Sequence, residues 1–305
     1  SHQFGFICHN IKSSATKKIM GRSYSKIADG KFALTNPEKK LGKGAFGTVF
    51  EGINVKTRDK VAIKIIESST GVKTKEQGRE LGVLTTLSKS KHRNLLQLLD
   101  HIYDEENGVL YLALELCSHN LKTHVEKNQH AFTESQLNDL LYQVANGYGE
   151  LRKNGIIHRD VKPSNILVTE DGGRITFKLA DFGLSRFMNS EESMKTMTVA
   201  GTPAYMAPEI LVEALLSDEA RFGPNSDVFS FGMIALFCLS RNNIKLQDRK
   251  TPDKLKNQVA TILDSRPTLS STLKGHLQKM LEFDPKDRMT DREFVFIFGG
   301  EFMIT

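Results

Sequence analysis

The chain has 305 residues, of which 39% are hydrophobic and 26% charged, a composition typical of a folded globular protein rather than a disordered one. Its three cysteines are scattered and form neither a disulfide framework nor a paired metal motif, which favours reduced thiols in an intracellular protein. The longest apolar run, residues 233–239, is much shorter than the ~20 residues that span a bilayer, and no signal-peptide pattern opens the chain. We therefore expect no transmembrane segment.

The net charge of +6 comes from the N-terminal part of the chain. Residues 1–40 contain eight Lys and Arg but only two acidic residues, and the remainder of the chain is neutral overall. A basic segment can contact acidic lipid, nucleic acid or an acidic protein. These charges form no sharp cluster with regular aromatic interleaving of the kind that a nucleic-acid-binding segment shows. We interpret residues 1–32 as a solvated N-terminal extension and expect no nucleic-acid partner.

Residues 33–117 are rich in strand patterns. Strand-type apolar runs are separated by turn residues and lie at residues 48–50, 61–66 and 109–114. One helical stretch, residues 74–88, interrupts them. Within it Glu80, Leu84 and Leu87 share one helix face because they are four and seven positions apart.

Helical patterns dominate from residue 118 onward. Thr133 and Gln136 have the spacing of a capping box, which marks a helix N-terminus. Apolar residues of helical period follow it at Leu137, Leu140, Leu141, Val144, Tyr148 and Leu151. A second apolar helix is predicted over residues 227–239. The change of pattern near residue 117 predicts two lobes, 33–117 and 118–305.

A glycine motif opens the first lobe. Gly42, Gly44 and Gly47 fit the spacing G-x-G-x-x-G, which dinucleotide-binding folds also use immediately before a helix. Here a strand-type run follows, so the sequence predicts a glycine-rich hairpin whose backbone N–H groups can approach phosphates. A purely structural hairpin is the alternative interpretation of the motif taken by itself.

Lys64 ends the apolar run 61–64 and is expected to be buried. An unpaired buried ammonium costs several kcal/mol, so Lys64 needs a carboxylate partner. Glu80 on the predicted helix is the preferred partner, and Glu76, one turn earlier, is the alternative. An ordinary salt bridge without any nucleotide would also explain this pair.

Three further motifs follow in order: His-Arg-Asp at residues 158–160 with Asn165 five residues after the Asp, Asp-Phe-Gly at 181–183, and Ala-Pro-Glu at 207–209. Together with the glycine motif and Lys64, this ordered set resembles the eukaryotic-type protein kinase family over about residues 40–290. The resemblance implies a bilobal α+β fold, with an antiparallel β-sheet N-lobe carrying one main helix and a mostly helical C-lobe. It also implies transfer of the γ-phosphate of ATP to protein hydroxyls.

The resemblance also implies chemical roles. Asp160 accepts the hydrogen bond of the attacking hydroxyl, and Lys162 offsets charge on the γ-phosphate. Asn165 and Asp181 supply the hard oxygen ligands that suit Mg²⁺. The expected cofactors are therefore ATP and Mg²⁺.

Other positions are expected to hold the nucleotide. Lys64 contacts the α- and β-phosphates, and Glu80 fixes its direction. The remaining ATP-binding positions implied by the resemblance are Gly42, Gly44, Gly47, Val49, Ala62, the gatekeeper Leu114, the backbone of Glu115 and Cys117, and Leu167. A regulatory stack is implied at Leu84, Leu98, His158 and Phe182. Core packing explains the apolar members of both sets equally well.

Lys162 and the segment 201–209 resemble the serine/threonine branch of the family. Thr202 is expected to hydrogen-bond Asp160 and Lys162 and to help seat the substrate. The expected partner is therefore a protein carrying a serine or threonine acceptor.

A regulatory phosphosite is expected at Thr198, four residues before Thr202. Arg159 and Arg186 are the cations that the resemblance places near such a phosphate. An ordinary polar loop is the alternative interpretation of these hydroxyl residues.

The sequence departs from the family pattern at scaffold positions. Phe229 stands where Trp is common, Met289 stands where proline is frequent, and the stretch 209–227 is longer than usual. The expected scaffold contacts keep their residues: Glu209 and Arg288 form a buried ion pair, and Asp227 caps the backbone of the catalytic loop.

Two other functions compete with an active kinase. A pseudokinase is expected to lack one of three chemical residues, yet Lys64, Asp160 and Asp181 are all present. A nucleic-acid-binding protein has only the basic N-terminal segment in its favour. We expect an active cytoplasmic kinase, or one acting in the host cytoplasm if the chain is a secreted bacterial effector.

Overall fold

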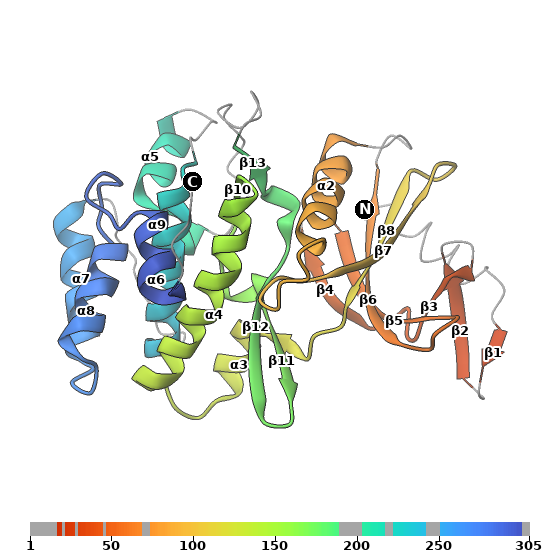
Figure 1. Ribbon diagram of the computed structural model, residues 1–305, viewed down its shortest axis with the longest axis horizontal. Coiled ribbons are helices and arrows are strands. Elements are labelled where there is room, and N and C mark those ends of the chain that lie inside the picture. Colours follow the sequence, from red (N-terminus) through yellow and green to blue (C-terminus); the bar gives the residue numbers. More distant parts are fainter. Residues whose placement is uncertain are drawn as a thin grey trace. The chain divides into compact units, whose positions relative to one another are not determined.

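A computed structural model describes residues 17–19, 22–27, 30–44, 47–68, 74–188, 203–216, 222–241 and 251–300 (Figure 1). The chain divides into two compact units. Unit 1 contains the described residues up to Lys89 together with Leu96–Cys117, and unit 2 contains Ser90–Leu95 and the described residues from Ser118 onward.

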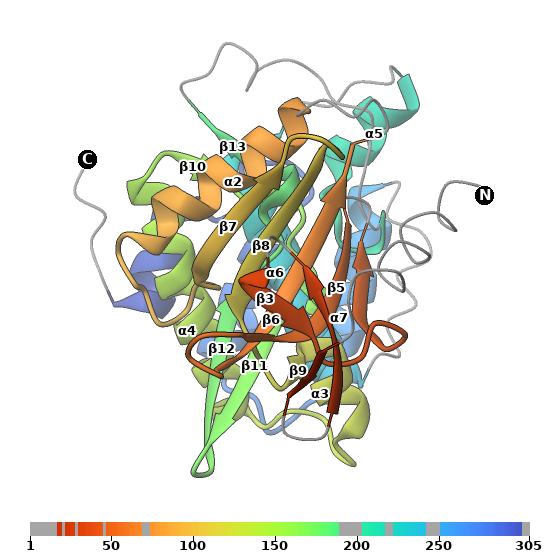
Figure 2. The same ribbon diagram turned by 90° about the vertical axis from the view of Figure 1, so that its right-hand side faces the viewer.

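Unit 1 is built on an antiparallel sheet in which β4 pairs with β5 and the other strands follow the order β1-β2-β3-β5-β6-β8-β7 (Figure 2). Its strands are β1 (Lys17–Ile19), β2 (Arg22–Ile27), β3 (Phe32–Leu34), β4 (Lys40–Gly44), β5 (Gly47–Asn54), β6 (Lys60–Glu67), β7 (Leu98–Asp104) and β8 (Val109–Glu115). The predicted strand runs at 48–50, 61–66 and 109–114 fall inside β5, β6 and β8, so these predictions are confirmed.

Part of the basic N-terminal segment belongs to this sheet. β1 pairs with β2, β2 pairs with β3 through Ser25 opposite Leu34, and β3 pairs with β5. Ile27 and Phe32 are buried in the core of the sheet. The sequence of these strands shows no alternating apolar pattern. Pairing with neighbouring strands and burial of a few apolar side chains hold them in the sheet.

One face of the sheet carries the hydrophobic core of unit 1. The residues of this core are Ile27, Phe32, Leu34, Phe50, Val61, Ile63, Ile65, Val109 and Ala113. Side chains alternate between the two faces along a strand. The alternate positions of β6, Ala62 and Lys64, therefore point to the opposite face.

Helix α2 (Lys75–Ser88) is anchored to the sheet at its N-terminus. Its N-cap Thr74 forms a capping box with Gln77, and the Gln77 side chain donates hydrogen bonds to the carbonyl oxygens of Ile66 and Gly108 at 2.8 and 3.1 Å. Its buried residues include Glu80, Leu84 and Leu87, which confirms the predicted helix face. The cap and the Gln77 contacts together fix where α2 begins against β6.

Unit 2 is mostly helical (Figure 1). Its α-helices are α3 (Leu121–Lys127), α4 (Glu134–Lys153), α5 (Pro208–Leu216), α6 (Pro224–Ser240), α7 (Pro252–Asp264), α8 (Ser271–Met280) and α9 (Asp291–Phe294), and a π-helical segment η6 (Val295–Gly299) follows α9. Its short strands are β9 (His119–Asn120), β10 (Ile156–Ile157), β11 (Ile166–Asp171), β12 (Arg174–Leu179) and β13 (Arg186–Phe187). They form a β12-β11-β9 sheet and a β10-β13 pair.

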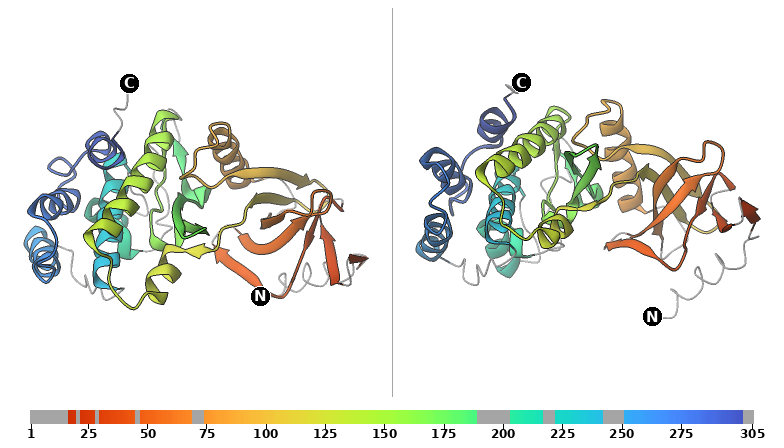
Figure 3. Two further views of the ribbon diagram at one scale, coloured as in Figure 1. Left: turned by 60° about the horizontal axis from the view of Figure 1, so that its bottom comes forward. Right: turned by 90° about the horizontal axis from the view of Figure 1, so that it is seen from below.

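Helices α4 and α6 form the centre of unit 2 and contact each other (Figure 3). The capping box of Thr133 and Gln136 starts α4, and the predicted apolar stripe of this helix is buried. Helix α6 is buried along almost its whole length, from Ser226 to Leu239, so it has no solvent-facing polar stripe. Within the described ranges, no helix has both the length and the hydropathy needed to cross a membrane.

The segment Ser90–Leu95 joins unit 2 through the buried side chain of Asn94. Its amide donates hydrogen bonds to Oε1 of Gln143 on α4 at 3.0 Å and to the carbonyl oxygen of Phe177 on β12 at 2.8 Å. The backbone of Asn94 also approaches α4 closely, since a Cβ added to Gly147 would lie 2.6 Å from the Asn94 carbonyl oxygen. These contacts explain why a segment between two elements of unit 1 packs with unit 2.

Candidate active site

The glycine motif forms the hairpin that the sequence predicts. β4 and β5 pair with Gly44 opposite Gly47, while residues 45–46 lie outside the described part. Gly47 is required by a close backbone approach, because a Cβ there would lie 2.4 Å from the carbonyl oxygen of Ile65 on β6. A Cβ on Gly42 would meet nothing within 4 Å. Steric crowding therefore requires glycine at position 47 but not at position 42.

Lys64 and Glu80 form a buried ion pair. The Nζ of Lys64 lies 2.6 Å from Oε1 of Glu80, and the two side chains are only 8% and 4% exposed. Glu76 instead lies within 3.6 Å of Arg79 at the surface of α2. The preferred partner of Lys64 is thus the one observed, and the alternative is excluded.

Strand register places the predicted nucleotide-binding side chains of unit 1 on one face of the sheet. Val49 of β5 lies opposite Lys64, and Ala62 of β6 lies opposite Leu114 of β8. Ala62 and Lys64 are two positions apart on one strand and so point the same way. Val49, Ala62, Lys64 and Leu114 consequently share a face, with Ala62 and Leu114 8% and 5% exposed.

The last residue of β8, Glu115, is held by Gln97, which lies directly before β7. Glu115 accepts a hydrogen bond from the Gln97 N–H through Oε1 at 2.8 Å, and its own N–H donates to the Gln97 carbonyl oxygen at 3.1 Å. Cys117 is half-buried. Leu167, the remaining apolar position predicted to contact ATP, is half-buried on β11 of unit 2.

The catalytic loop of unit 2 is held by one buried carboxylate. Asp227 on α6 accepts hydrogen bonds from the backbone N–H groups of His158 and Arg159 at 2.8 and 2.9 Å, which confirms its expected capping role. Burial raises the pKa of Asp227, although His158 and the two N–H donors oppose this shift. Arg159 has a left-handed backbone with φ of 68°. The Asp227 bonds hold the loop in this strained conformation.

Asp160, Lys162 and Asn165 are brought together by this loop. The Nζ of Lys162 lies 2.6 Å from Oδ2 of Asp160. The amide of Asn165 donates to the same Oδ2 at 2.8 Å and to the Asp160 carbonyl oxygen at 2.9 Å. The amide nitrogen of Asn165 thus faces Asp160, and Oδ1 is the side-chain atom that could act as the expected oxygen ligand.

His158 joins the catalytic loop to the end of β12. One ring nitrogen, Nε2, lies 3.1 Å from the Ala180 carbonyl oxygen, which can only accept, so Nε2 carries the proton. Nδ1 then accepts the Asp160 N–H at 3.3 Å. The ring also contacts Phe182, with centroids 5.4 Å apart. Two of the predicted stack residues are therefore in contact within unit 2.

The other two residues of the predicted stack belong to unit 1. Leu84 on α2 is buried and Leu98 on β7 is half-buried. Their positions fit ordinary core packing of that unit as well as a regulatory role.

Asp181 occupies a strained position beside the loop. Its backbone is left-handed, with φ of 62° and ψ of 73°, and it precedes the short 3-10 helix η3 (Phe182–Leu184). The preceding residue, Ala180, donates its N–H to the Asn165 carbonyl oxygen at 2.9 Å. Asn165 and Asp181 are thereby neighbours that offer an amide oxygen and a carboxylate, a hard donor set that fits Mg²⁺.

The predicted regulatory positions Thr198 and Thr202 lie outside the described residues. The two arginines predicted to serve a phosphate at Thr198 are both buried. Arg186 donates to the Ser185 carbonyl oxygen at 2.8 Å, and the guanidinium of Arg159 lies 5.3 Å from the ring centroid of Phe222.

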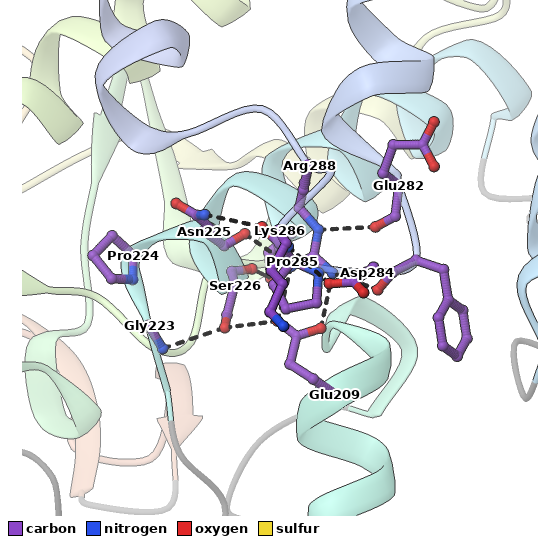
Figure 4. A network of polar contacts seen from close by, with 12 residues as sticks. Glu209, Gly223, Pro224, Asn225, Ser226, Glu282, Asp284, Pro285, Lys286 and Arg288 are labelled. Carbon is purple, nitrogen blue, oxygen red and sulfur yellow. Dashed lines mark hydrogen bonds and ion pairs between the residues drawn. The ribbon is translucent and has the colours of Figure 1, made fainter.

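The expected Glu209–Arg288 ion pair is confirmed and is bidentate (Figure 4). The two terminal guanidinium nitrogens, Nη1 and Nη2, each lie 2.8 Å from a Glu209 oxygen, and Ser226 donates to the same carboxylate at 3.0 Å. Phe229, which replaces a common Trp, packs its ring 5.0 Å from the Arg288 guanidinium. The aromatic ring at this position therefore keeps a cation–π contact with the ion pair.

Gln77 is a positioning residue that the sequence analysis missed. Its amide ties the start of α2 to the backbone of unit 1 and thereby supports the helix that carries Glu80. The signal was present, since Thr74 and Gln77 have the same capping-box spacing as Thr133 and Gln136.

Comparison with known proteins agrees with this geometry. The protein kinase domain family matches residues 35–296. The serine/threonine-protein kinase unc-51 of Caenorhabditis elegans is 31% identical over 267 residues, which cover 83% of this chain and 30% of the relative. The serine/threonine-protein kinase ULK1 of Homo sapiens is 32% identical over 279 residues, which cover 87% of this chain and 25% of the relative.

A third relative is a probable myosin light chain kinase of Dictyostelium discoideum, 35% identical over 201 residues, which cover 66% of this chain and 54% of the relative. The matches thus span between a quarter and about half of the length of these relatives. The family match covers most of the chain and agrees with an antiparallel sheet in unit 1, a helical unit 2 and the motif residues held in ordered contacts. This chain belongs to the eukaryotic-type protein kinase family, in its serine/threonine branch.

Proposed function

We propose that this chain catalyses transfer of the γ-phosphate of Mg·ATP to serine or threonine hydroxyls of a protein substrate. The observation that carries the proposal is the contact of Asp160 with both Lys162 and Asn165 in a loop held by Asp227. The buried Lys64–Glu80 pair supports nucleotide binding, and the names of the relatives support a serine or threonine acceptor.

Positioning and charge neutralisation are the main tasks of a phosphoryl-transfer enzyme, because the transition state is loose. Asp160 orients the attacking hydroxyl through a hydrogen bond and accepts its proton late. Lys162, already 2.6 Å from that carboxylate, presents its ammonium to the transferring group. Lys64 binds the α- and β-phosphates in a direction set by Glu80.

Asn165 and Asp181 are the residues that would hold Mg²⁺. Asn165 is oriented for this by its two donations to Asp160, which fix the amide plane. Bound there, Mg²⁺ would neutralise phosphate charge. The backbone bond from Ala180 to Asn165 keeps the two ligand residues adjacent.

The test is transfer of radiolabelled γ-phosphate from ATP to a library of serine, threonine and tyrosine peptides. The Asp160→Asn variant should lose activity by roughly 10²- to 10⁴-fold, because the general base is removed. Its dissociation constant for a fluorescent ATP analogue should stay within about threefold of the unaltered protein. Asp171→Asn, at the exposed end of β11, is the matched control and should keep full activity.

The outcomes separate the competing functions. ATP binding without transfer in the unaltered protein would identify a pseudokinase. Phosphate appearing mainly on tyrosine would contradict the serine/threonine assignment.

We further propose that phosphorylation of Thr198 raises the activity of the chain and that Thr202 helps to seat the substrate. The proposal rests on the sequence position of Thr198 relative to Thr202. Thr198→Ala should reduce kcat while the control Ser193→Ala does not. Mass spectrometry of the fully active protein should show phosphate on Thr198, and a fully active unphosphorylated protein would contradict the proposal.

A further inference from the structure

Three potential metal-ligating side chains meet in unit 2, outside the residues assigned to phosphoryl transfer. Nε2 of His119 lies 3.0 Å from Nδ1 of His124. The nearer carboxylate oxygen of Glu170 lies 3.5 Å from the His119 nitrogen and 3.7 Å from the His124 nitrogen. Within the described ranges these residues form a cluster whose ligand atoms all fall within 4.8 Å of one another.

The fold brings this cluster together from three elements (Figure 2). His119 on β9 lies opposite Val168 of β11, and Glu170 follows two residues later on the same face of that strand. Asn120 caps α3 by accepting the Thr123 N–H at 2.9 Å, which starts the helix directly after β9. His124 lies on the first turns of α3 and therefore returns toward β9.

The ring of His124 is fixed by its aromatic neighbours. Phe132 and Phe177 both meet it edge to face, at interplanar angles of 86° and 89° and centroid distances of 6.0 and 6.2 Å. The side chains of His119 and His124 are 13% and 12% exposed, whereas Glu170 is 50% exposed. The two histidine side chains are therefore mostly buried, whereas Glu170 is at the surface and leaves its side of the cluster open to solvent.

The spacing suits one small divalent ion. In a tetrahedral zinc site with bond lengths of about 2.0–2.1 Å, ligand atoms are about 3.3 Å apart. The distances of 3.0, 3.5 and 3.7 Å surround that value. The His119 and His124 nitrogens face each other at hydrogen-bonding distance, so one of them carries a hydrogen. Metal binding therefore requires the other tautomer of that ring and a rotation that turns both lone pairs toward the ion.

The charges around the cluster act in opposite directions. Burial lowers the pKa of both imidazoles, and for His124 the neighbouring His119 adds to the effect, which favours the neutral form over the charged one. The negative charge of Glu170 favours a bound cation, whereas the positive charge of Lys127 disfavours it. A site with two imidazoles and one carboxylate favours zinc over magnesium or calcium, because the latter two prefer oxygen ligands alone.

We propose that His119, His124 and Glu170 bind one Zn²⁺ ion, which joins β9 and the start of α3 to β11. Water completes the coordination on the exposed side of Glu170. The ion acts as a structural clamp on this corner of unit 2, and the proposal is independent of the phosphoryl-transfer activity.

Zinc binding is tested on the whole chain without a histidine tag, by competition with a chromogenic chelator. The unaltered protein should bind one Zn²⁺ with micromolar or higher affinity. Mg²⁺ and Ca²⁺ should not compete at millimolar concentrations. At a Zn²⁺ concentration of 100 times the Kd, the melting temperature should rise by roughly 4–8 °C.

His119→Ala and His124→Ala should each weaken zinc binding by at least about 100-fold, since even loss of an outer-shell partner costs about 10- to 100-fold. Glu170→Ala should weaken it as well, and this half-exposed position keeps the fold intact if either histidine variant does not fold. His130→Ala is the matched control, because His130 is an exposed histidine outside the cluster and one of nine in the chain. Absence of zinc binding, or binding that Glu170→Ala and the histidine variants leave unchanged, would overturn the proposal.

Discussion

Lys64 and Glu80 place opposite charges 2.6 Å apart in side chains that are almost fully buried. Such a pair gives little net stability, because burial removes the hydration of both ions. Removing one partner is much more costly, since the remaining charge stays buried without its counterion. At the residue scale, the pair therefore fixes the direction of the Lys64 side chain more than it stabilises unit 1.

Glu80→Gln should lower the free energy of unfolding by about 3 kcal/mol, because the ammonium of Lys64 loses its carboxylate partner. Urea unfolding followed by circular dichroism measures the change. The matched control is Glu76→Gln on the same helix, where the side chain is 50% exposed, and its effect should stay within about 0.5 kcal/mol. Equal effects of the two variants would contradict the argument.

Gly47→Ala should destabilise the protein by roughly 1–3 kcal/mol, because the added Cβ would lie 2.4 Å from a backbone oxygen of β6. Gly42→Ala adds the same methyl group to the same hairpin where nothing lies within 4 Å. Thermal unfolding of both variants measures the difference, and a Gly42→Ala variant as unstable as Gly47→Ala would show that the close approach to Ile65 is not the cause.

At the scale of elements, α6 supports the catalytic loop through its first turn. Asp227 uses both carboxylate oxygens to accept the N–H groups of His158 and Arg159. The loop has a left-handed residue at Arg159, which ordinary backbone preferences do not favour. Tertiary hydrogen bonds from a helix almost 70 residues away in the sequence therefore hold the conformation that presents Asp160.

Asp227→Asn should lower the free energy of unfolding by about 1–3 kcal/mol at pH 7, because the amide group faces one of the two N–H donors and leaves it unsatisfied. Phosphate transfer should fall as well, since the loop loses a restraint. Asp253→Asn, in the exposed first turn of α7, is the matched control and should change neither quantity. Equal losses in both variants would refute the role of Asp227.

At the scale of the whole molecule, each unit is held by contacts between distant parts of the sequence. In unit 2, Arg288 bonds bidentately to Glu209, 79 residues away, and also donates to the carbonyl oxygens of Asn225, Glu282 and Phe283 (Figure 4). This one guanidinium joins α5, the start of α6 and the segment after α8. Its planar group of donors matches these acceptors in a way that a lysine ammonium does not.

Arg288→Lys should lower the stability of unit 2 by about 3 kcal/mol, because the ammonium cannot reproduce the bidentate bond and leaves buried acceptors unpaired. Amide hydrogen exchange should then become faster in α5, α6 and α8. Arg292→Lys, on the exposed side of α9, makes the same chemical change without these contacts and should leave exchange unchanged. Unaltered exchange in Arg288→Lys would contradict this view of unit 2.

The sequence by itself determined the family, the order of the motifs and the main secondary structure. It determined the helix that begins at Thr133, its buried stripe and the central strands β5, β6 and β8, because capping residues and apolar periodicity act over a few positions. The roles expected for Asp160, Asn165 and Asp181 likewise follow from local motifs, and assays are needed to test them.

Only the tertiary structure decided which distant groups meet. The structure shows that Lys64 pairs with Glu80 and not with Glu76. It places Ile27 and Phe32 in the core of unit 1. It also brings His119 and His124 close to Glu170. Such contacts depend on strand register and on how packed elements approach each other. A sequence pattern encodes the face of a helix or strand, but its partner is chosen by the packing that buries both faces at once.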